Sequence, residues 1–106
     1  MVGGAYGTPG FVWDSRKDDA NEAKHGIHFR QAASAFSDIW GIIEEDRRHS
    51  DTEERFTLIG LDGSGRCLRV SFCYRGGGKT IRLISARLAS RVELERYFRL
   101  RGRKGR

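Results

Sequence analysis

The 106-residue chain contains one proline, two cysteines and no long apolar segment. The proline lies within residues 1–10 together with four glycines, so we expect these residues to form a flexible lead-in. No run approaches the roughly eighteen apolar residues of a membrane-spanning helix, and residues 1–10 lack the basic-then-apolar order of a signal peptide. The sequence therefore predicts neither a membrane protein nor a secreted one.

The two cysteines do not form a redox or metal-binding motif. Cys67 and Cys73 lie six residues apart in one predicted strand, so they point to the same face but are too distant to form a disulfide. Cysteines without Cys-x-x-Cys spacing are typical of reduced, structural positions. We therefore expect a cytoplasmic protein.

Motifs for metal, nucleotide and nucleophilic chemistry are also missing. The three histidines, His25, His28 and His49, show no i, i+4 pairing, so no metal site is predicted. The chain has no P-loop, no dinucleotide-binding glycine motif and no nucleophile elbow. Residues 76–78 are glycines between two predicted strands and indicate a turn, and His49 with Asp46 indicates a solvated charged loop. We expect no cofactor.

Acidic residues are scarce in the last quarter of the chain. Residues 82–106 hold nine Lys and Arg against two Glu, whereas residues 1–81 hold eleven against twelve Asp and Glu. The net charge of +6 therefore comes from the last 25 residues. This asymmetry favours a polyanionic partner, with nucleic acid first and an acidic protein second. For residues 101–106 alone, a solvated basic tail explains the charge equally well.

The first third of the chain has a helical pattern. Residues 11–13 could form a short edge strand, and Asp14 is a plausible N-cap for a helix that ends at His25. Gly26 stands where a left-handed C-cap is expected. Apolar residues recur at helical spacing from Phe29 to Phe36, which predicts a second helix.

Strand patterns follow, over residues 39–44, 55–61, 67–74 and 80–86. A final helix is expected to begin at Ser90, where Glu93 completes a capping box, and to bury Leu94, Tyr97 and Phe98. Short turns between strands indicate antiparallel pairing. The predicted fold class is α+β: one domain over residues 11–100, with an antiparallel sheet of about four strands preceded by two helices and followed by one.

Two arginines lie in the most apolar of these strands, residues 81–87. A guanidinium keeps its charge, so Arg82 and Arg87 each need a carboxylate or a phosphate. Glu53 or Glu54 could supply the carboxylate, and RNA could supply the phosphate. The arginines are five residues apart, so a continuous strand would place them on opposite faces. For both to serve one site, the strand would have to end near Ser85 or Ala86.

The residue types suit cleavage of RNA without a metal. That reaction needs a base for the 2′-hydroxyl, cations for the developing negative charge and an acid for the leaving 5′-oxygen. Lys24 and His25 share one helix face with Asn21. A favourable interaction with the helix dipole explains a cation there as well, and is the more economical reading. The pair Glu54 and Arg55 is likewise open to a purely structural reading.

Several segments together resemble the BrnT family of ribonuclease toxins. They are Phe11-Val12-Trp13-Asp14, Asn21 with Lys24-His25-Gly26, Glu53-Glu54-Arg55-Phe56, Ile81–Arg87, and Glu93 to Tyr97, in unbroken order over about residues 11–98. The resemblance implies a RelE-like fold and an endoribonuclease of the mRNA interferase type that inhibits translation and growth. It also implies neutralisation by a BrnA-like antitoxin whose ribbon-helix-helix domain binds operator DNA, so that this chain meets DNA only indirectly and no membrane.

The resemblance also implies a site. The expected catalytic residues are His25, Glu54, Arg55, Arg82 and Arg87, and the expected RNA-binding residues are Lys24, Arg69 and Arg91. Arg82 and Arg87 would stabilise the phosphate, and His25 or Glu54 would move protons. Alternatives are a non-catalytic nucleic-acid-binding protein and a degenerate toxin that acts only with its antitoxin. His28 departs from the family's usual small N-cap, which predicts a poorly capped second helix.

Overall fold

The computed structural model describes residues 10–49 and 52–104. Nine of the ten residues of the expected lead-in therefore lie outside the described residues. The elements are, in order, β1 (Phe11–Val12), α1 (Ser15–His25), α2 (Phe29–Ser34), η2 (Ala35–Ser37), β2 (Ile42–Glu45), η3 (Arg47–His49), β3 (Phe56–Leu61), β4 (Cys67–Arg75), η4 (Gly76–Gly78), β5 (Thr80–Leu88) and α3 (Arg91–Lys104). This order confirms the predicted α+β class.

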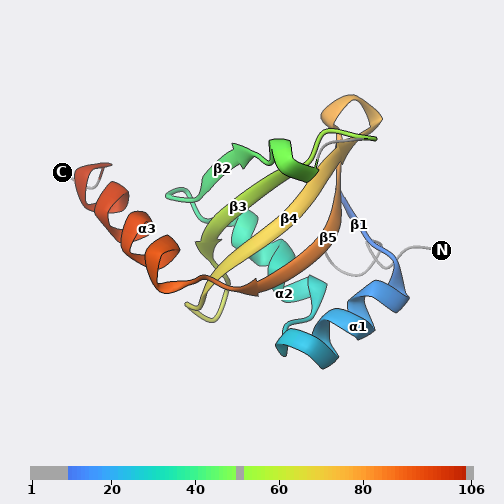
Figure 1. Cartoon of the computed structure of the whole chain (residues 1–106), viewed down its shortest axis with the longest axis horizontal. Helices are drawn as coiled ribbons and strands as arrows, with labels where there is room; N and C mark the ends of the chain where they lie inside the picture. Colours follow the sequence, from blue (N-terminus) through green and yellow to red (C-terminus); the bar gives the residue numbers. More distant parts are fainter. Residues whose placement is uncertain (1–9, 50–51, 105–106) are drawn as a thin grey trace.

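The described strands form one sheet with the order β1-β5-β4-β3-β2 (Figure 1). Strands β2 to β5 are antiparallel neighbours, as the short turns predict. The expectation of an antiparallel sheet of about four strands needs one correction, because β1 adds a fifth strand that runs parallel to β5. The chain leaves β1 through two helices and three strands before β5 returns beside it, so the edge pair is a crossover.

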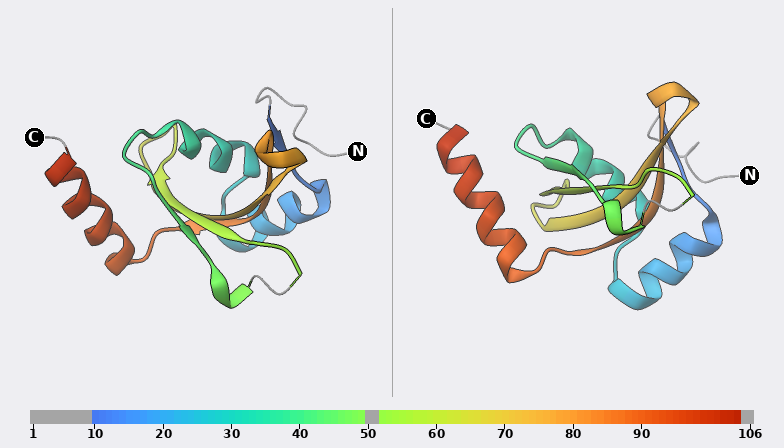
Figure 2. Two further views of the ribbon diagram at one scale, coloured as in Figure 1. Left: turned by 90° about the horizontal axis from the view of Figure 1, so that it is seen from above. Right: turned by 45° about the horizontal axis from the view of Figure 1, so that its top comes forward.

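One face of the sheet packs against α2 and carries the hydrophobic core. Trp13, Phe29, Leu58, Phe72 and Leu83 are almost fully buried there. Figure 2 shows α2 on this side of the sheet and the β2–β3 connection on the other. Alternation along β4 places Leu68, Val70 and Phe72 in the core, so the residues between them point to the opposite face.

A side chain from α1 caps α2. His28 is the N-cap residue of α2, and the backbone N–H of Phe29 donates a hydrogen bond of 2.7 Å to Asp18 Oδ1. Asp18 therefore satisfies one of the amides that a small polar N-cap would otherwise serve. Gly26 ends α1 with φ of 72°, the left-handed conformation that the sequence predicts.

Asn21 fixes α1 against the edge of β5. Its amide nitrogen donates to the carbonyls of Ile27 and Ala86, both at 2.8 Å. Its amide oxygen accepts from the N–H of Ala86 at 3.0 Å. The side chain is buried and meets the backbone of Ala86 as a neighbouring strand would.

A bulge in β5 changes the face on which its later residues lie. Ser71 pairs with Ser85, but Phe72 pairs with Leu83, so Ile84 is an extra residue in β5. We expected that the strand would have to end near Ser85 or Ala86 if both arginines were to serve one site. This expectation is wrong, because β5 continues to Leu88. The extra residue brings Arg82 and Arg87 to one face.

The last helix begins with the predicted capping box. The N–H of Ser90 donates to Glu93 Oε1 at 2.8 Å, and the N–H of Glu93 donates to Ser90 Oγ at 3.2 Å. Tyr97 is fully buried, but the expected burial of Leu94 and Phe98 is wrong, because these side chains are 37% and 49% exposed. Helix α3 extends from one end of the sheet (Figure 1).

The final helix includes part of the segment expected as a basic tail, since α3 ends at Lys104. Within the described residues, no helix is both long enough and apolar enough to cross a membrane.

Candidate functional site

The sheet face opposite α2 gathers the arginines of β4 and β5. Paired residues of antiparallel strands lie on the same face. The pairs are Arg69 with Arg87, Ser71 with Ser85, and Cys73 with Arg82. We call this surface the open face; it comprises Thr57, Arg69, Ser71, Cys73, Arg82, Ser85 and Arg87. Both cysteines of β4 are free thiols.

Arg82 is neutralised by Glu53. Its Nη2 lies 2.8 Å from Glu53 Oε1, and Arg75 Nη2 lies 3.1 Å from Glu53 Oε2. The hydrogen bond from Arg82 holds the pKa of the Glu53 carboxyl below its ordinary value, and the same bond raises the pKa of Arg82. Of the two carboxylates that the sequence offered, Glu53 is the partner. Glu54 is exposed and forms no ion pair with Arg82 or Arg87.

Arg87 and Arg69 share Glu93, a partner that the sequence did not suggest. Arg87 makes two hydrogen bonds to the carboxylate, at 2.9 and 3.0 Å, and Arg69 Nε lies 3.3 Å from Glu93 Oε2. Burial raises the pKa of Glu93, but hydrogen bonds from Arg87 and from the Ser90 amide outweigh it, so the pKa is lowered. Each carboxylate therefore pairs with two arginines. These groups of one carboxylate and two arginines, which we call the two arginine clusters, each keep one positive charge that is not neutralised.

A pocket of about 220 Å³ opens beside these clusters. Its lining combines cations, hydroxyls and a histidine–carboxylate pair: Asp46, His49, Arg55, Arg69, Ser71, Ile84 and Ser85. We call it the open-face pocket. His49 Nδ1 lies 3.0 Å from Asp46 Oδ2. The loop that the sequence indicated to be merely solvated therefore forms one wall of the pocket.

The connection between β2 and β3 carries three of the lining residues. The N–H of Asp46 donates to the carbonyl of Arg55 at 2.7 Å, which extends the β2–β3 ladder by one pair. Because Phe56 packs against the core, its neighbour Arg55 points to the open face. Earlier in the same connection, the short turn η3 places the His49 ring beside the Asp46 carboxylate. The three-residue spacing of Asp46 and His49 was the available sequence signal for this pair.

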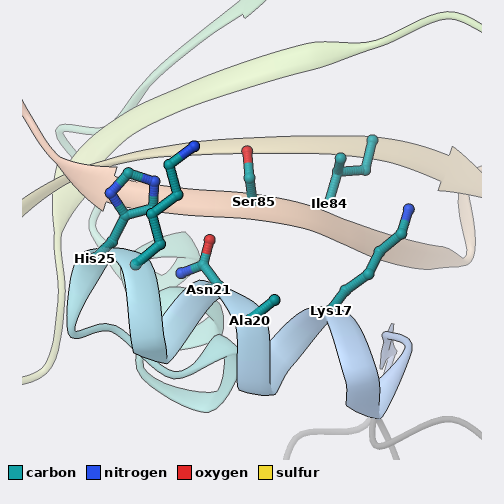
Figure 3. Close-up of a pocket in the computed structure, with 7 residues that line it drawn as sticks. Lys17, Ala20, Asn21, His25, Ile84 and Ser85 are labelled. Carbon is teal, nitrogen blue, oxygen red and sulfur yellow. The ribbon is translucent and has the colours of Figure 1, made fainter.

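A second pocket, of about 210 Å³, lies between α1 and β5. Figure 3 shows Lys17, Asn21 and His25 projecting from α1 toward Ile84 and Ser85. We call it the α1 pocket, and its complete lining is Lys17, Ala20, Asn21, Lys24, His25, Ile84 and Ser85. Ile84 and Ser85 also line the open-face pocket. The bulge in β5 is thus the wall between the two pockets.

The predicted site residues fall into three groups. Arg55 and Arg69 line the open-face pocket, and Lys24 and His25 line the α1 pocket. Arg82 and Arg87 share the open face but are held by carboxylates. These two arginines line neither pocket, and neither do Glu54 and Arg91. The Arg91 side chain is 91% exposed and pairs with Glu95. Lys17, Asp46 and His49 are pocket residues that were not predicted as site residues.

The open-face pocket has the chemistry of an anion site with an acid–base group. Guanidinium groups match the oxygens of a phosphate, and an imidazole can accept or donate a proton near neutral pH. Among the described residues, no group of three histidine, cysteine or acidic side chains could hold a metal ion.

Comparisons with known proteins place this chain in a family. No curated protein matches the chain. Residues 13–93 match the family model described as the ribonuclease toxin BrnT of type II toxin–antitoxin systems. The crystal structure of the Brucella abortus ribonuclease toxin BrnT is similar, with a TM-score of 0.54 and 27% identity over 74% of this chain and 94% of that one. Both pockets are built from residues within the matched segment. This chain belongs to the BrnT family of ribonuclease toxins of type II toxin–antitoxin systems.

Proposed function

We propose that this protein is an endoribonuclease toxin that cleaves RNA in the open-face pocket without a metal ion. The observation that carries the proposal is the pocket itself, where Arg55 and Arg69 lie beside the Asp46–His49 pair. Membership of a ribonuclease toxin family agrees with it. In cells, cleavage of messenger RNA would inhibit translation and growth, and the cytoplasm would be the site of action.

The reaction is a transesterification. The 2′-hydroxyl loses its proton to a base, and its oxygen attacks the adjacent phosphorus. The bond to the 5′-oxygen breaks, and that oxygen takes a proton. The products are a 2′,3′-cyclic phosphate and a 5′-hydroxyl. Arg55 and Arg69 stabilise the negative charge that grows on the phosphoryl oxygens, which is the role for which fixed guanidinium groups are best suited.

The ion pairs of the open face keep it stable without RNA. Arg69 is the weaker partner of Glu93, at 3.3 Å against 2.9 Å for Arg87. An incoming phosphate can therefore recruit Arg69 while Glu93 stays paired with Arg87. Arg82 and Arg87 strengthen the positive electrostatic potential around the pocket. We keep the proposal that both help to stabilise the phosphate during cleavage.

The α1 pocket would bind the neighbouring nucleotide. Because the two pockets meet at Ile84 and Ser85, one RNA strand can cross the bulge and contact both. Lys24, which lines this pocket, would anchor the RNA backbone, and His25, from the same lining, would donate a proton to the leaving 5′-oxygen. Glu54 and Arg91 are weaker candidates, for proton transfer and RNA binding respectively, because both are exposed and lie outside the pockets.

The partner that we propose is a BrnA-like antitoxin with a ribbon-helix-helix domain. A type II antitoxin is a protein that masks its toxin, and a chain with a net charge of +6 favours an acidic segment in that partner. Contact with operator DNA would then be made by the antitoxin.

Arginine substitutions test the site. We expect Arg69→Ala to slow the cleavage of an end-labelled RNA in EDTA by roughly 10²- to 10³-fold, as for removal of a transition-state donor. The matched control is Arg30→Ala, because Arg30 is an exposed arginine on α2, on the other side of the sheet. Equal rates for Arg69→Ala and the wild type would refute the site. RNA that is bound but left intact by the wild type would favour the non-catalytic alternative.

A further inference from the structure

We propose that His49 is the general base of the cleavage reaction and that Asp46 positions it. This inference rests on the proposed ribonuclease function and adds the residue that takes the proton from the 2′-hydroxyl. Neither the sequence patterns nor the family resemblance assigned a role to either residue.

The geometry of the pair defines which nitrogen reacts. His49 Nδ1 lies 3.0 Å from Asp46 Oδ2, and the Asp46 side chain is only 13% exposed. A carboxylate that accepts a hydrogen bond from Nδ1–H fixes the tautomer in which Nε2 is unprotonated. The His49 side chain is 63% exposed, so a substrate in the pocket can reach the ring.

The surroundings of His49 supply the rest of the reaction centre. The charged groups that line the same pocket are Asp46 from the end of β2, Arg55 from the start of β3 and Arg69 from β4. In RNA the 2′-hydroxyl lies next to the 3′-phosphate of its own ribose, so a phosphate held by the two guanidinium groups would bring that hydroxyl near the other lining side chains. His49 is the histidine among these side chains.

The other histidines lack this combination. His25 lines the α1 pocket, across Ser85 from the open-face pocket. His28 lies 3.6 Å from Asp18 Oδ1, but it stands at the N-terminus of α2 and lines neither pocket. His28 and Asp18 therefore form a natural control: a histidine–aspartate pair of similar exposure without access to the site.

The proposed step balances its protons. His49 Nε2 takes the proton of the 2′-hydroxyl as the bond from O2′ to phosphorus forms. The bond from phosphorus to O5′ breaks, and O5′ takes a proton from His25, the acid proposed above for the leaving group. His49 returns its proton to solvent before the next turnover.

The test is a single-turnover cleavage assay across pH with a defined RNA. We expect His49→Ala to lower the rate by about 10²- to 10⁴-fold, the usual contribution of general acid–base catalysis. The limb of the pH–rate profile that reports deprotonation of a histidine should disappear. Added imidazole should restore part of the activity of His49→Ala. We expect His28→Ala to cleave at the wild-type rate with an unchanged profile.

Asp46→Asn tests the positioning role. An amide in place of the carboxylate can donate to Nδ1 and favour the tautomer protonated at Nε2, which cannot act as a base. We expect a lower rate constant with little change in RNA affinity. If His49→Ala does not fold, as judged by circular dichroism, His49→Asn carries the same test, because it retains a polar side chain facing Asp46.

The outcomes separate the two proposals. If the wild type cleaves no RNA, the ribonuclease function itself fails. If the wild type cleaves and folded His49→Ala is equally fast, the ribonuclease function stands and the role of His49 is refuted. A slow variant with an unchanged pH profile and no rescue by imidazole would assign His49 a structural role and also overturn the inference.

Discussion

At the residue scale, two carboxylates explain how arginines occupy an apolar strand. Glu53 pairs with Arg82, and Glu93 pairs with Arg87 and Arg69. The sequence indicated that a carboxylate or a phosphate must be present, and the structure shows that carboxylates pair with both arginines. The carboxylates satisfy the resting charges, and their unequal sharing leaves positive charge for a substrate.

Glu93 should make stability depend on acidic pH. Its folded-state pKa lies below the ordinary value of 4.5, so its stabilising effect is complete above that value and is lost as the pH falls through the folded-state pKa. We expect Glu93→Gln to lower the free energy of unfolding at pH 7 by about 1–3 kcal/mol, as for hydrogen bonds to charged groups. We also expect the variant to lose less stability than the wild type below pH 4.5.

Urea unfolding at several pH values measures this effect. Glu95→Gln is the control, because the Glu95 side chain is 62% exposed and pairs with Arg91 on the helix surface. An acid-induced loss that is equal in Glu93→Gln and the wild type would show that Glu93 does not hold the cluster together.

At the element scale, buried polar side chains help to attach the flanking helices to the sheet. Asn21 joins α1 to β5, and Tyr97 joins α3 to Asp38, whose carboxylate also accepts the N–H of Leu61 from β3. These contacts decide where the walls of the site stand, since α1 carries the lysines of the α1 pocket and α3 carries Glu93.

Asn21→Ala should destabilise the fold strongly. The substitution removes three buried hydrogen bonds and leaves the N–H and carbonyl of Ala86 without their partners. We expect a loss of about 2–4 kcal/mol in the free energy of unfolding, measured with urea. Glu22→Ala, at the exposed next position of α1, should change it by less than about 0.5 kcal/mol. Similar values for the two variants would contradict the anchoring role.

Tyr97→Phe should weaken the attachment of α3 to the rest of the fold. The clearest sign should be a change in how the stability of the fold depends on pH. Burial, with a contribution from Asp38, raises the pKa of Tyr97 to about 12. A raised pKa means that the neutral phenol stabilises the fold fully below its ordinary value of 10.0 and that this effect is lost as the pH rises toward 12.

Thermal unfolding between neutral pH and pH 11 tests this attachment. We expect Tyr97→Phe to cost about 1–2 kcal/mol at neutral pH and to lose less stability than the wild type at alkaline pH. The control is Tyr74→Phe, since Tyr74 is 41% exposed. An alkaline loss of stability in Tyr97→Phe as steep as in the wild type would exclude Tyr97 as its source.

Also at this scale, caps and strand alternation were predictable, but strand register was not. Asp14, Gly26 and the pair Ser90–Glu93 mark helix ends through local hydrogen bonds, so the sequence indicates them directly. The extra residue Ile84 exists only relative to β4. The five-residue spacing of Arg82 and Arg87 therefore suggested that they lie on opposite faces of the sheet, whereas the bulge places them on the same face.

At the scale of the whole molecule, the site is assembled from distant segments. Asp46 and His49 lie in a loop, and only the pairing of β2, β3 and β4 brings that loop beside Arg69. The sequence shows the spacing of these residues but not their common pocket. For the same reason, the helical pattern of α3 predicted an apolar stripe but not what packs against it. Among the described residues, no helix or strand covers Leu94 and Phe98 fully, and both side chains remain exposed.

We propose above that the RNA is cut by attack of its own 2′-hydroxyl, in a pocket of this protein that needs no metal ion. Mass spectrometry of the fragments made by the purified protein in excess EDTA tests it most directly. We expect fragments ending in a 2′,3′-cyclic phosphate paired with fragments beginning in a 5′-hydroxyl, and far fewer of both with Arg69→Ala. Fragments with 5′-phosphates, or a requirement for a divalent ion, would contradict it.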